Sequence, residues 1–281
     1  MSAAERGHRV TLFEASGEIG GQFRLAMRIP GKEEFAETLR YYTRRMEVLG
    51  VDVRLGSRAT AADLGRYDAV VVATGVEPRV PELDGITHPK VVSYPDAITG
   101  AVEVGSRVAV MGAGGIGVDV SHLLTHDSAS TRDDWFAHWG VGDPAVDRGG
   151  VKEKKPRVAA REVFLLQRKT SAIGKGLGKT SGWAHRAVLR DSEVRMIPAV
   201  RYRRIDDVGL HITVGEGDDA ADQVLEVDHV VVCTGQEPVR ALYDDLAAAG
   251  RDVHLVGGAD VAAELDAKRA IDQGTRLAAT L

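Results

Sequence analysis

Residues 107–121 read RVAVMGAGGIGVDVS and place three glycines between an apolar run and a segment with helical spacing. Gly112, Gly114 and Gly117 form the pattern G-x-G-x-x-G directly after the predicted strand 107–111. In this pattern the first glycine permits a tight turn, the second lets a pyrophosphate approach the backbone, and the third lets helix and strand pack closely. The helix that follows offers free N–H groups at its positive end. We therefore predict a dinucleotide-binding turn here, in preference to a glycine-rich turn of purely structural role.

Outward from this turn, strand-like apolar runs alternate with helical segments. The runs lie at residues 10–14, 51–55, 69–73, 107–111, 163–167, 229–233 and 253–256. Several are apolar without alternation, as expected for parallel strands that are covered on both faces. Residues 33–49 predict a helix that ends at Gly50, and a last helix is expected over about 260–280, with Asp260 as its N-cap. The pattern predicts an α/β fold with mostly parallel sheets.

Two segments of the chain resemble each other. Residues 69–79 read AVVVATGVEPR, and residues 229–240 read HVVVCTGQEPVR. Each joins a predicted buried strand to Thr-Gly and then to Glu-Pro; Thr74 and Gly75 are the first such pair. We expect the chain to leave a sheet edge at Gly75 and at Gly235, where backbone passes close to a ligand or turns tightly. A duplicated strand and turn without a ligand is the alternative.

Composition excludes several classes of function. The 281 residues suffice for two domains, and 44% hydrophobic with 27% charged residues is an ordinary globular mixture. The net charge of −5 gives no general attraction to nucleic acid or to anionic membranes. The sequence shows neither a membrane-spanning run nor a signal peptide, so we expect a cytoplasmic protein without nucleic-acid or membrane partners. The single cysteine, Cys233, can form neither an internal disulfide nor the thiolate set of an iron–sulfur cluster.

The residues after the run 163–167 indicate which nucleotide binds to the glycine turn. An acid at this position favours a free ribose 2′-hydroxyl, and arginine favours a 2′-phosphate. The sequence supplies Arg168 and Lys169 and no acid, which predicts NADP; two solvated surface charges are the alternative. The distance from the glycines exceeds the usual spacing of about 20 residues. We interpret residues 125–160 as an insertion, to which the sequence assigns no role.

The N-terminal stretch MSAAERGHRVTLFEASGEIGGQF predicts part of a second dinucleotide site. Glu14 ends the run 10–14, where an acid binds ribose hydroxyls. Because no basic residue follows that strand, we expect a nucleotide without a 2′-phosphate, such as FAD. Gly21 and Gln22 would turn the backbone along this cofactor.

Three later residues complete the expected FAD site. Lys32 is expected near the phosphates, and the backbone of Ala59 beside the adenine edge. Asp260 and the N–H groups after it would meet ribityl or pyrophosphate oxygens, directly or through water. Taken alone, Lys32 and Ala59 are more often ordinary surface or loop residues, and Asp260 would serve equally as a helix cap.

The order of these segments resembles the two-dinucleotide-domain flavoprotein reductases and, more closely, the bacterial 2,4-dienoyl-CoA reductases of the NADH:flavin oxidoreductase family. The resemblance covers essentially the whole chain, including the insertion, and GLGKTSGWAHR is its most specific segment. The other segments are GHRVTLFEASGEIGGQF, IPGKEEFAETLRYY, VAVMGAGGIGVDV, LLQRK and GGADVAAELDAKRAIDQGTRLA. We expect two nested Rossmann-like domains: an FAD-binding domain of residues 1–103 and 230–281, and an NADP-binding domain of residues 104–229.

The resemblance also implies an activity. In that family an N-terminal TIM barrel holds FMN and the substrate, and a 4Fe–4S cluster follows it. Electrons pass from NADPH through FAD, the cluster and FMN to an unsaturated fatty acyl-CoA of β-oxidation. We therefore expect FAD and NADP in this chain, with FMN and the cluster in the N-terminal part. Hydride transfer to flavin is chemistry of the cofactors, so we expect no catalytic acid or base and no metal ligand here. His185 would lie near the nicotinamide or simply pack.

We further expect the chain to be a C-terminal fragment that lacks the first strand and glycine turn of the FAD domain. That strand would be central in its sheet, so its neighbours would lose pairing and the chain would bind FAD poorly. Two other functions stay open. One is a related flavoprotein that acts on another enone or on an amine. Arg168 and Lys169 argue against the amine, because the amine dehydrogenase relatives do not use NADP in this domain. The other is a non-catalytic nucleotide-binding module, which a complete G-x-G-x-x-G unit permits.

Overall fold

The computed structural model describes residues 1–262 and 267–281. The chain divides into two compact units: an outer unit of Met1–Arg79 with Gln236–Leu281, and a middle unit of Val80–Gly235. In chain order the middle unit is nested inside the outer one. Its boundaries differ from the predicted ones, because residues 80–103 and 230–235 belong to the middle unit. The reason is strand pairing: the segment Val91–Ser93 joins the sheet of the middle unit.

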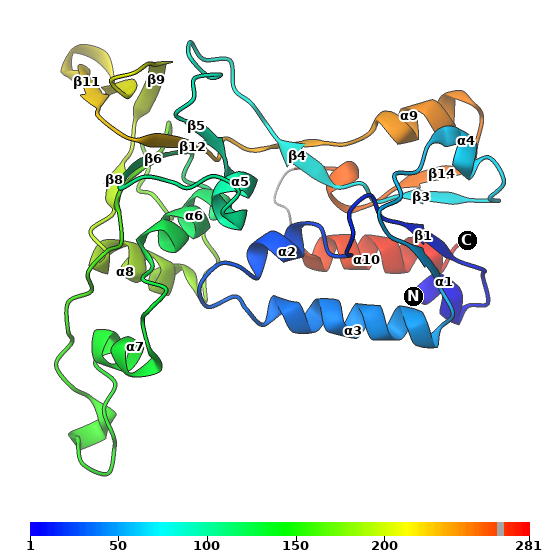
Figure 1. The fold of residues 1–281 in the computed structure, drawn as a ribbon, viewed down its shortest axis with the longest axis horizontal. Helices are drawn as coiled ribbons and strands as arrows, with labels where there is room; N and C mark the ends of the chain where they lie inside the picture. The colour runs from blue at the N-terminus through cyan, green and yellow to red at the C-terminus, as the bar shows by residue number, and fades with distance from the viewer. Residues whose placement is uncertain (263–266) are drawn as a thin grey trace. The chain divides into compact units, whose positions relative to one another are not determined.

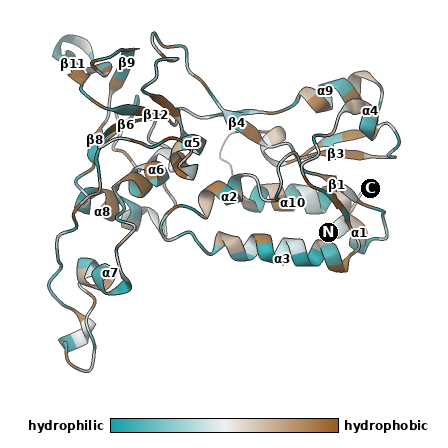
Figure 2. Cartoon of the chain, viewed as in Figure 1, coloured by the Kyte–Doolittle hydropathy of each residue, from teal (hydrophilic) through white to brown (hydrophobic). Residues whose placement is uncertain are grey.

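A five-stranded, fully parallel sheet forms the centre of the middle unit (Figure 1). Its order is β5 (Val91–Ser93), β12 (His229–Val232), β6 (Arg107–Met111), β7 (Glu162–Leu166) and β8 (Arg195–Ile197). Residues 108–111 of β6 are all 0% exposed, as expected for a parallel strand with a neighbour on each side and cover on both faces. Figure 2 colours β6 and β12 as hydrophobic, which agrees with their burial.

Helices pack on one face of this sheet, and a second sheet packs on the other. One face packs against α5 (Tyr94–Thr99) and α6 (Gly115–Thr125), and α8 (Gly182–Asp191) packs against α6. The other face, which includes Met111 and Leu166, shares a hydrophobic cluster with a three-stranded antiparallel sheet. That second sheet consists of β9 (Val200–Ile205), β10 (Leu210–Val214) and β11 (Ala221–Leu225), with η2 (Gly217–Asp219) between the last two.

The predicted insertion is an arm of the middle unit, visible in green in Figure 1. We call residues 126–160 the arm. It contains α7 (Arg132–Trp139) and the short helix η1 (Arg148–Gly150). The N–H of Ala160 donates to the carbonyl of Thr125 (3.2 Å), which closes the base of the arm where α6 ends. An antiparallel bridge between Val141 and Val151 closes it further out.

The outer unit builds three separate strand pairs. The pairs are β1 (Thr11–Phe13) with β2 (Asp52–Arg54), β3 (Val70–Val72) with β14 (Val253–Leu255), and β4 (Val76–Pro78) with β13 (Gln236–Pro238). The first two pairs are parallel and the third is antiparallel. Among the described residues, β1 pairs only with β2 and β14 only with β3. Each of these strands therefore has one edge without a partner strand.

The two parallel pairs nevertheless share a core. Phe13 of β1 and Leu255 of β14 both pack against the buried cluster that contains Val72 and Leu246. The rings of Phe13 and Tyr67 meet edge to face, with centroids 6.1 Å apart. The outer unit also contains α1 (Ser2–Glu5), α2 (Gln22–Ala26), α3 (Phe35–Val48), α4 (Ala61–Leu64), α9 (Ala241–Ala248), η3 (Gly257–Ala259) and α10 (Ala267–Ala278).

The structure can be compared with the predicted ends of two helices. The helix expected over 33–49 is α3, and Gly50 follows it with φ +65°, as a C-terminal glycine should. The expectation for the last helix is wrong at its start, because Val261 and Ala262 are not helical and Asp260 therefore does not cap α10. Residues 263–266 lie outside the described residues. No helix in the part that is described combines the length and apolar character needed to cross a bilayer.

Candidate functional site

The three glycines of the turn after β6 differ in what surrounds them. Gly112 has φ +104°, and a Cβ there would stand 2.3 Å from the carbonyl oxygen of Cys233. A Cβ on Gly117 would stand 1.8 Å from the carbonyl oxygen of Gly112, whereas a Cβ on Gly114 would meet nothing within 4 Å. The fold therefore requires the first and third glycines. The second faces open space, which is what the close approach of a pyrophosphate needs.

Helix α6 begins at this turn without a capping side chain. Gly114 is its N-cap and makes no side-chain hydrogen bond to the N–H groups of the first turn. Such N–H groups, at the positive end of an 11-residue helix, favour an anionic ligand. The turn and the helix together can hold the pyrophosphate of a dinucleotide.

Arg168 and Lys169 lie at the same edge of the sheet as the glycine turn. In the β6–β7 register Met111 is opposite Leu166, and the N–H of Gly112 donates to the carbonyl of Leu166 (3.0 Å). Both cationic side chains are exposed. Nε2 of Gln167 donates to the carbonyl oxygens of Ser171 (2.6 Å) and Lys169 (3.1 Å), which orders the start of the loop. The two cations are thus available to a phosphate beside the turn.

Tyr202 of β9 also reaches this edge, and sequence reasoning missed it. Its hydroxyl donates to the carbonyl of Leu166 (3.4 Å) and interacts with the backbone of Gly112. Burial raises the pKa of Tyr202 to about 12, while the Gly112 backbone and the charge of Arg168 act in the opposite direction. The hydroxyl therefore stays protonated at neutral pH. No local pattern signals this contact, because Leu166 is 36 residues away in sequence.

In the outer unit, Glu14 stands at the carboxyl end of β1, as expected for a residue that binds ribose. Its Oε1 accepts hydrogen bonds from the N–H and the hydroxyl of Ser16, both at 2.8 Å. The N–H of Ser57 donates to the Glu14 carbonyl (2.8 Å), so the chain after β2 runs beside Glu14. Ala59 lies on this segment and packs against the core of the unit. Glu14 and Ala59 therefore belong to one edge of the β1–β2 pair.

The next predicted FAD residues form a separate segment. Gly21, with φ +47°, is the N-cap of α2, and the exposed Gln22 is the first residue of that helix. Lys32 lies in the turn before α3, where its N–H donates to the carbonyl of Ile29 (2.9 Å). A turn along a cofactor is compatible with this backbone.

The two similar segments found in the sequence meet in space. Strands β4 and β13 pair antiparallel, with Pro78 opposite Gln236. The hydroxyl of Thr74 donates to the carbonyl of Val239 (2.5 Å), and the N–H of Val239 donates to the carbonyl of Gly75 (3.1 Å). Thr74 and Gly75 therefore hold the two crossing segments together. Gly75 has φ +75°, which accounts for the glycine there without a ligand.

Asp260 has a structural role in the outer unit. It ends the short helix η3, and its Oδ2 accepts a hydrogen bond from Nε2 of Gln273 in α10 (2.9 Å). Nη2 of Arg240 lies 3.9 Å from Oδ1, and Nε of the same arginine donates to the carbonyl of Ala259 (2.8 Å). Asp260 thus joins η3 to α10 and to the start of α9. Its backbone is also bonded within the unit, because its N–H donates to the carbonyl of Gly257 (3.2 Å) and its carbonyl accepts a hydrogen bond from Nη2 of Arg240.

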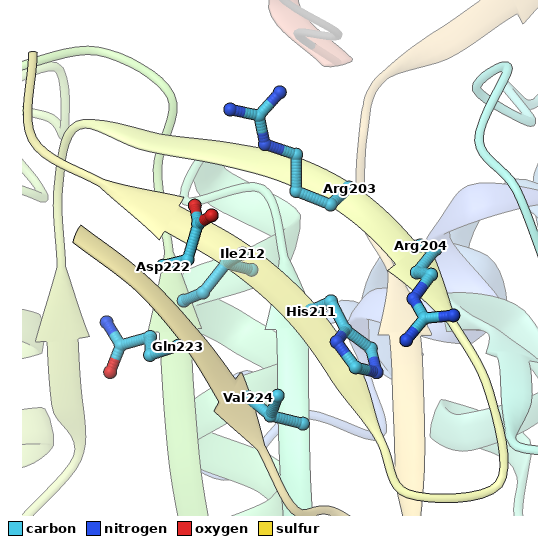
Figure 3. Close-up of a pocket in the computed structure, with 7 residues that line it drawn as sticks. All are labelled: Arg203, Arg204, His211, Ile212, Asp222, Gln223 and Val224. Carbon is cyan, nitrogen blue, oxygen red and sulfur yellow. The ribbon is translucent and has the colours of Figure 1, made fainter. Parts of the chain in front are cut away.

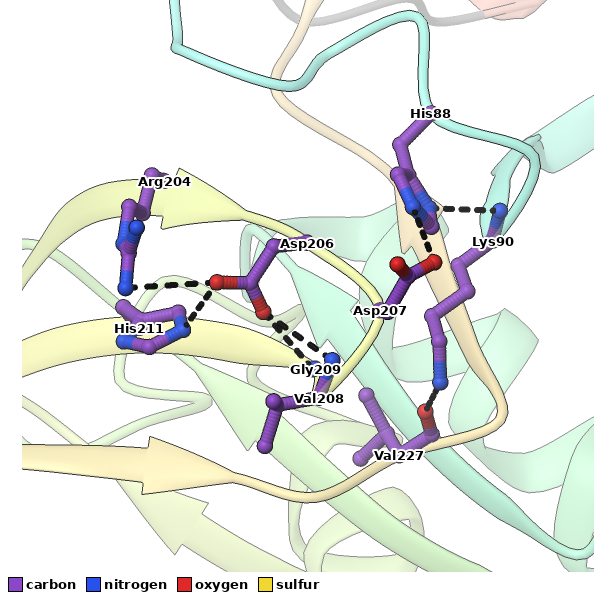
Figure 4. A network of polar contacts seen from close by, with 9 residues as sticks. All are labelled: His88, Lys90, Arg204, Asp206, Asp207, Val208, Gly209, His211 and Val227. Atoms are coloured by element: carbon purple, nitrogen blue, oxygen red, sulfur yellow. Dashed lines mark hydrogen bonds and ion pairs between the residues drawn. The ribbon is translucent and has the colours of Figure 1, made fainter.

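Two further polar groups of residues in the middle unit lie on or beside the sheet of β9, β10 and β11. A hollow of about 300 Å³ on the β9–β11 sheet is lined by Arg203, Arg204, His211, Ile212, Asp222, Gln223 and Val224 (Figure 3). Asp222 there accepts a hydrogen bond from Thr213, which in turn accepts one from Arg203. Beside it, the hydrogen bond from His211 lowers the pKa of Asp206, which also pairs with Arg204 (Figure 4). These charges neutralise one another and leave no candidate site.

Comparison with known proteins agrees with the two-nucleotide arrangement. A family model described as pyridine nucleotide-disulphide oxidoreductase matches residues 1–265. The chain belongs to this family. It is thus an FAD- and NAD(P)H-binding chain of a flavin-dependent oxidoreductase, with the α/β fold expected from its sequence. A dithiol is absent from it, because Cys233 is the single cysteine, and burial raises the pKa of its thiol.

Three proteins that are similar to this chain are all longer than it. It is 35% identical over 261 residues to N,N-dimethylglycine/sarcosine dehydrogenase of Chromohalobacter salexigens, covering 86% of this chain and 32% of that protein. It is 24% identical over 266 residues to a metal reductase of Desulforamulus reducens, covering 92% of this chain and 38% of that protein. A solved 2-naphthoyl-CoA reductase complex superposes with a TM-score of 0.80 at 25% identity, covering 99% of this chain and 37% of that one. The chain spans about a third of the length of these relatives.

Proposed function

We propose that this chain is the electron-input part of an NADPH-dependent reductase of the 2,4-dienoyl-CoA reductase type. NADPH would bind to the middle unit, with its pyrophosphate at Gly114 and α6 and its 2′-phosphate at Arg168 and Lys169. FAD would bind to the outer unit, with Glu14, Gly21, Gln22, Lys32 and Ala59 as contacts. The observation on which the proposal depends most is the placement of Arg168 and Lys169 beside the glycine turn, with no acid there.

The residues of the chain bind and orient; the transfer itself is chemistry of the cofactors. Bound FAD would supply the acceptor for a hydride from NADPH. Residues at the glycine turn would hold the pyrophosphate, and Tyr202 would fix the turn relative to the end of β7. The backbone at Asp260 and the residues around Thr74 and Gly75 would shape the FAD side. In the whole protein, a 4Fe–4S cluster and FMN outside this chain would pass the electrons to an unsaturated acyl-CoA.

Support for an acyl-CoA substrate comes from two sources. The segment Gly176–Arg186, GLGKTSGWAHR, resembles the dienoyl-CoA reductases. The name of 2-naphthoyl-CoA reductase also places a conjugated acyl-CoA in a protein of this architecture. Similarity to N,N-dimethylglycine/sarcosine dehydrogenase favours a second candidate, oxidation of an amine. In that case the flavin would be reduced by the amine and the two cations at the end of β7 would have no phosphate to bind.

The test uses the complete protein and its Arg168→Ala variant. We expect the wild type to prefer NADPH to NADH, and the substitution to weaken NADPH binding by about ten- to hundredfold, since a hydrogen bond to a charged group contributes about 1.5–3 kcal/mol. NADH use should stay unchanged. Equal use of both nucleotides, unaffected by the substitution, would contradict the NADP assignment.

Arg195→Ala is the matched control. Arg195 begins β8 and pairs with Glu162 (3.0 Å) at the opposite, amino end of β7, so its removal should affect neither nucleotide. Substrate class is decided separately, by NADPH oxidation in the presence of a 2,4-dienoyl-CoA and by flavin reduction with N,N-dimethylglycine. Reduction of the flavin by the amine, without use of the dienoyl-CoA, would support the second candidate. The protein could also bind NADPH and FAD and turn over neither substrate. That result would favour a non-catalytic nucleotide-binding module.

A further inference from the structure

The arm contacts α8 through an aromatic pair. Trp135 and Trp139 lie on α7, and Trp183 lies in the first turn of α8. The rings of Trp139 and Trp183 meet edge to face, with centroids 6.3 Å apart and planes at 81°. The ring of Trp135 is 6.1 Å from that of Trp139 and makes no ring contact with α8 in the part of the chain described. These are the three tryptophans of the whole sequence.

A second contact joins the arm to the other end of α8. His138 is 9% exposed, and its Nε2 lies 3.6 Å from Oδ2 of Asp191, the last residue of α8. Two consecutive residues of α7 therefore meet the first and last turns of the same helix. Within the arm, the N–H of Lys155 donates to the carbonyl of Ala137 near the C-terminal end of α7 (2.9 Å), which joins the returning chain to this helix.

Helix α8 in turn holds the loop that follows β7. Nη1 of Arg186 donates to the carbonyl of Gly174 in that loop (2.9 Å). A Cβ on Gly182 would stand 2.8 Å from Cβ of Leu177, so the loop lies directly on the first turn of α8. This is the loop that begins with Arg168 and Lys169. Contacts therefore run from the arm through α8 to Gly174 and Leu177, in the loop that begins with Arg168 and Lys169.

We propose that the arm is a brace that positions residues 168–181 for a nucleotide carrying a 2′-phosphate, with Trp139 as the positioning residue. The inference rests on the proposed NADP site. It assigns to the insertion a role in nucleotide discrimination, exerted through Trp183 and α8 without contact with the nucleotide. The two ends of the arm explain its place in the sequence: it begins where α6 ends and returns to the start of β7.

The test measures binding to the full 281-residue chain by calorimetry, with 2′,5′-ADP and 5′-ADP as probes. We expect Trp139→Ala to weaken binding of 2′,5′-ADP by about three- to tenfold, the range that an aromatic pair contributes, and to leave 5′-ADP almost unchanged. Trp139→Phe, which keeps an aromatic ring, should restore most of the preference. Trp135→Ala is the matched control, because it removes an exposed tryptophan of the same helix that does not contact α8.

Intrinsic fluorescence of the wild type gives an independent readout. Since all three tryptophans belong to α7 and α8, 2′,5′-ADP should change the emission and 5′-ADP should change it less. If the wild type binds both probes equally, the NADP site and the brace are both wrong. The wild type could instead prefer 2′,5′-ADP while Trp139→Ala leaves the ratio of the two affinities unchanged. In that case only the proposed role of the arm is wrong. Should Trp139→Ala not fold, His138→Gln decides, because it removes the contact at the other end of α8 and should lower the same ratio.

Discussion

The two units of this chain differ in how their parallel strands are paired and buried. In the middle unit, β6 has a parallel neighbour on each side, and four of its five residues are buried. In the outer unit, β1 and β14 each have one neighbour among the described residues, and none of their residues is fully buried. A glycine turn on a sheet with neighbours on both sides is rigid, whereas residues at the end of a strand with one neighbour depend on side-chain packing for their position. The comparison indicates that the middle unit has the better-formed nucleotide site.

The largest effect is expected from the third glycine of the turn. Gly117→Ala places a Cβ 1.8 Å from a backbone oxygen, so we expect a loss of stability of the middle unit of about 3 kcal/mol or more. Gly114→Ala is the matched control, because the space beside Gly114 is open; it should melt like the wild type but bind NADPH more weakly. Thermal unfolding and NADPH titration check both. Equal melting temperatures for the two variants would contradict the packing role of Gly117.

Hydrogen exchange measures the difference between the units directly. We expect amides of β1 and β14 to exchange at least about a hundredfold faster than those of β6 and β7, because strands with a free edge open locally at low cost. Mass spectrometry of peptides that contain Thr11–Phe13, Val253–Leu255 and Arg107–Met111 gives the comparison. Equal protection of all three peptides would show that the outer strands are as stable as the central ones.

The weaker pairing of the outer strands should also affect how well the chain retains FAD. We expect this chain, purified alone, to hold FAD well below one equivalent while still binding 2′,5′-ADP, since the contacts proposed for FAD lie on the less buried strands. Absorbance of the flavin per chain, measured after gel filtration, checks this. Tight stoichiometric FAD would show that the two parallel strand pairs of the outer unit suffice for binding.

A smaller effect is expected when the hydroxyl of Tyr202 is removed from the nucleotide site proposed in the middle unit. Tyr202→Phe removes the contact with the carbonyl of Leu166 and the backbone of Gly112. We expect NADPH binding to weaken about fivefold, corresponding to about 1 kcal/mol for one hydrogen bond. Tyr41→Phe, at a 52% exposed position of the outer unit, is the control and should have no effect. An unchanged NADPH affinity in Tyr202→Phe would exclude this hydroxyl from the site.

The smallest effect concerns pH and the arm. Burial lowers the pKa of His138 below its ordinary value of 6.5; Arg157 and Lys154 act in the same direction, and Asp191 and a backbone contact with Lys155 oppose them. In the unfolded chain this histidine binds a proton below about pH 6.5, whereas the folded chain binds it only at a lower pH, so stability falls as the pH drops through about 6.5. We expect His138→Gln to reduce the difference in melting temperature between about pH 7.5 and about pH 5.5. A difference equal to that of the wild type would assign the acid sensitivity to other groups.

Local chemistry made much of this fold predictable. The apolar runs at β6, β7 and β12 lack alternation because both faces are covered, and their parallel pairing follows. The turn at Gly112–Gly117 was predictable because three glycines at fixed spacing leave few backbone alternatives. The start of α10 was not, because Asp260 is bound by Gln273 and Arg240, which are distant in sequence. The domain boundaries were also missed, because pairing of β5 with β12 joins segments that lie about 140 residues apart along the chain.

What the sequence by itself determined is the α/β framework of parallel strands, the order of strand, glycine turn and helix at residues 107–121, and the two cations after the next strand. These properties depend on residues close together in the chain, where spacing and side-chain type decide the outcome. Only the tertiary structure decided that the open glycine is Gly114, that Tyr202 reaches the turn, and that Trp139 and His138 hold α8. Those contacts join residues far apart in sequence, so their formation depends on how the sheets and helices pack.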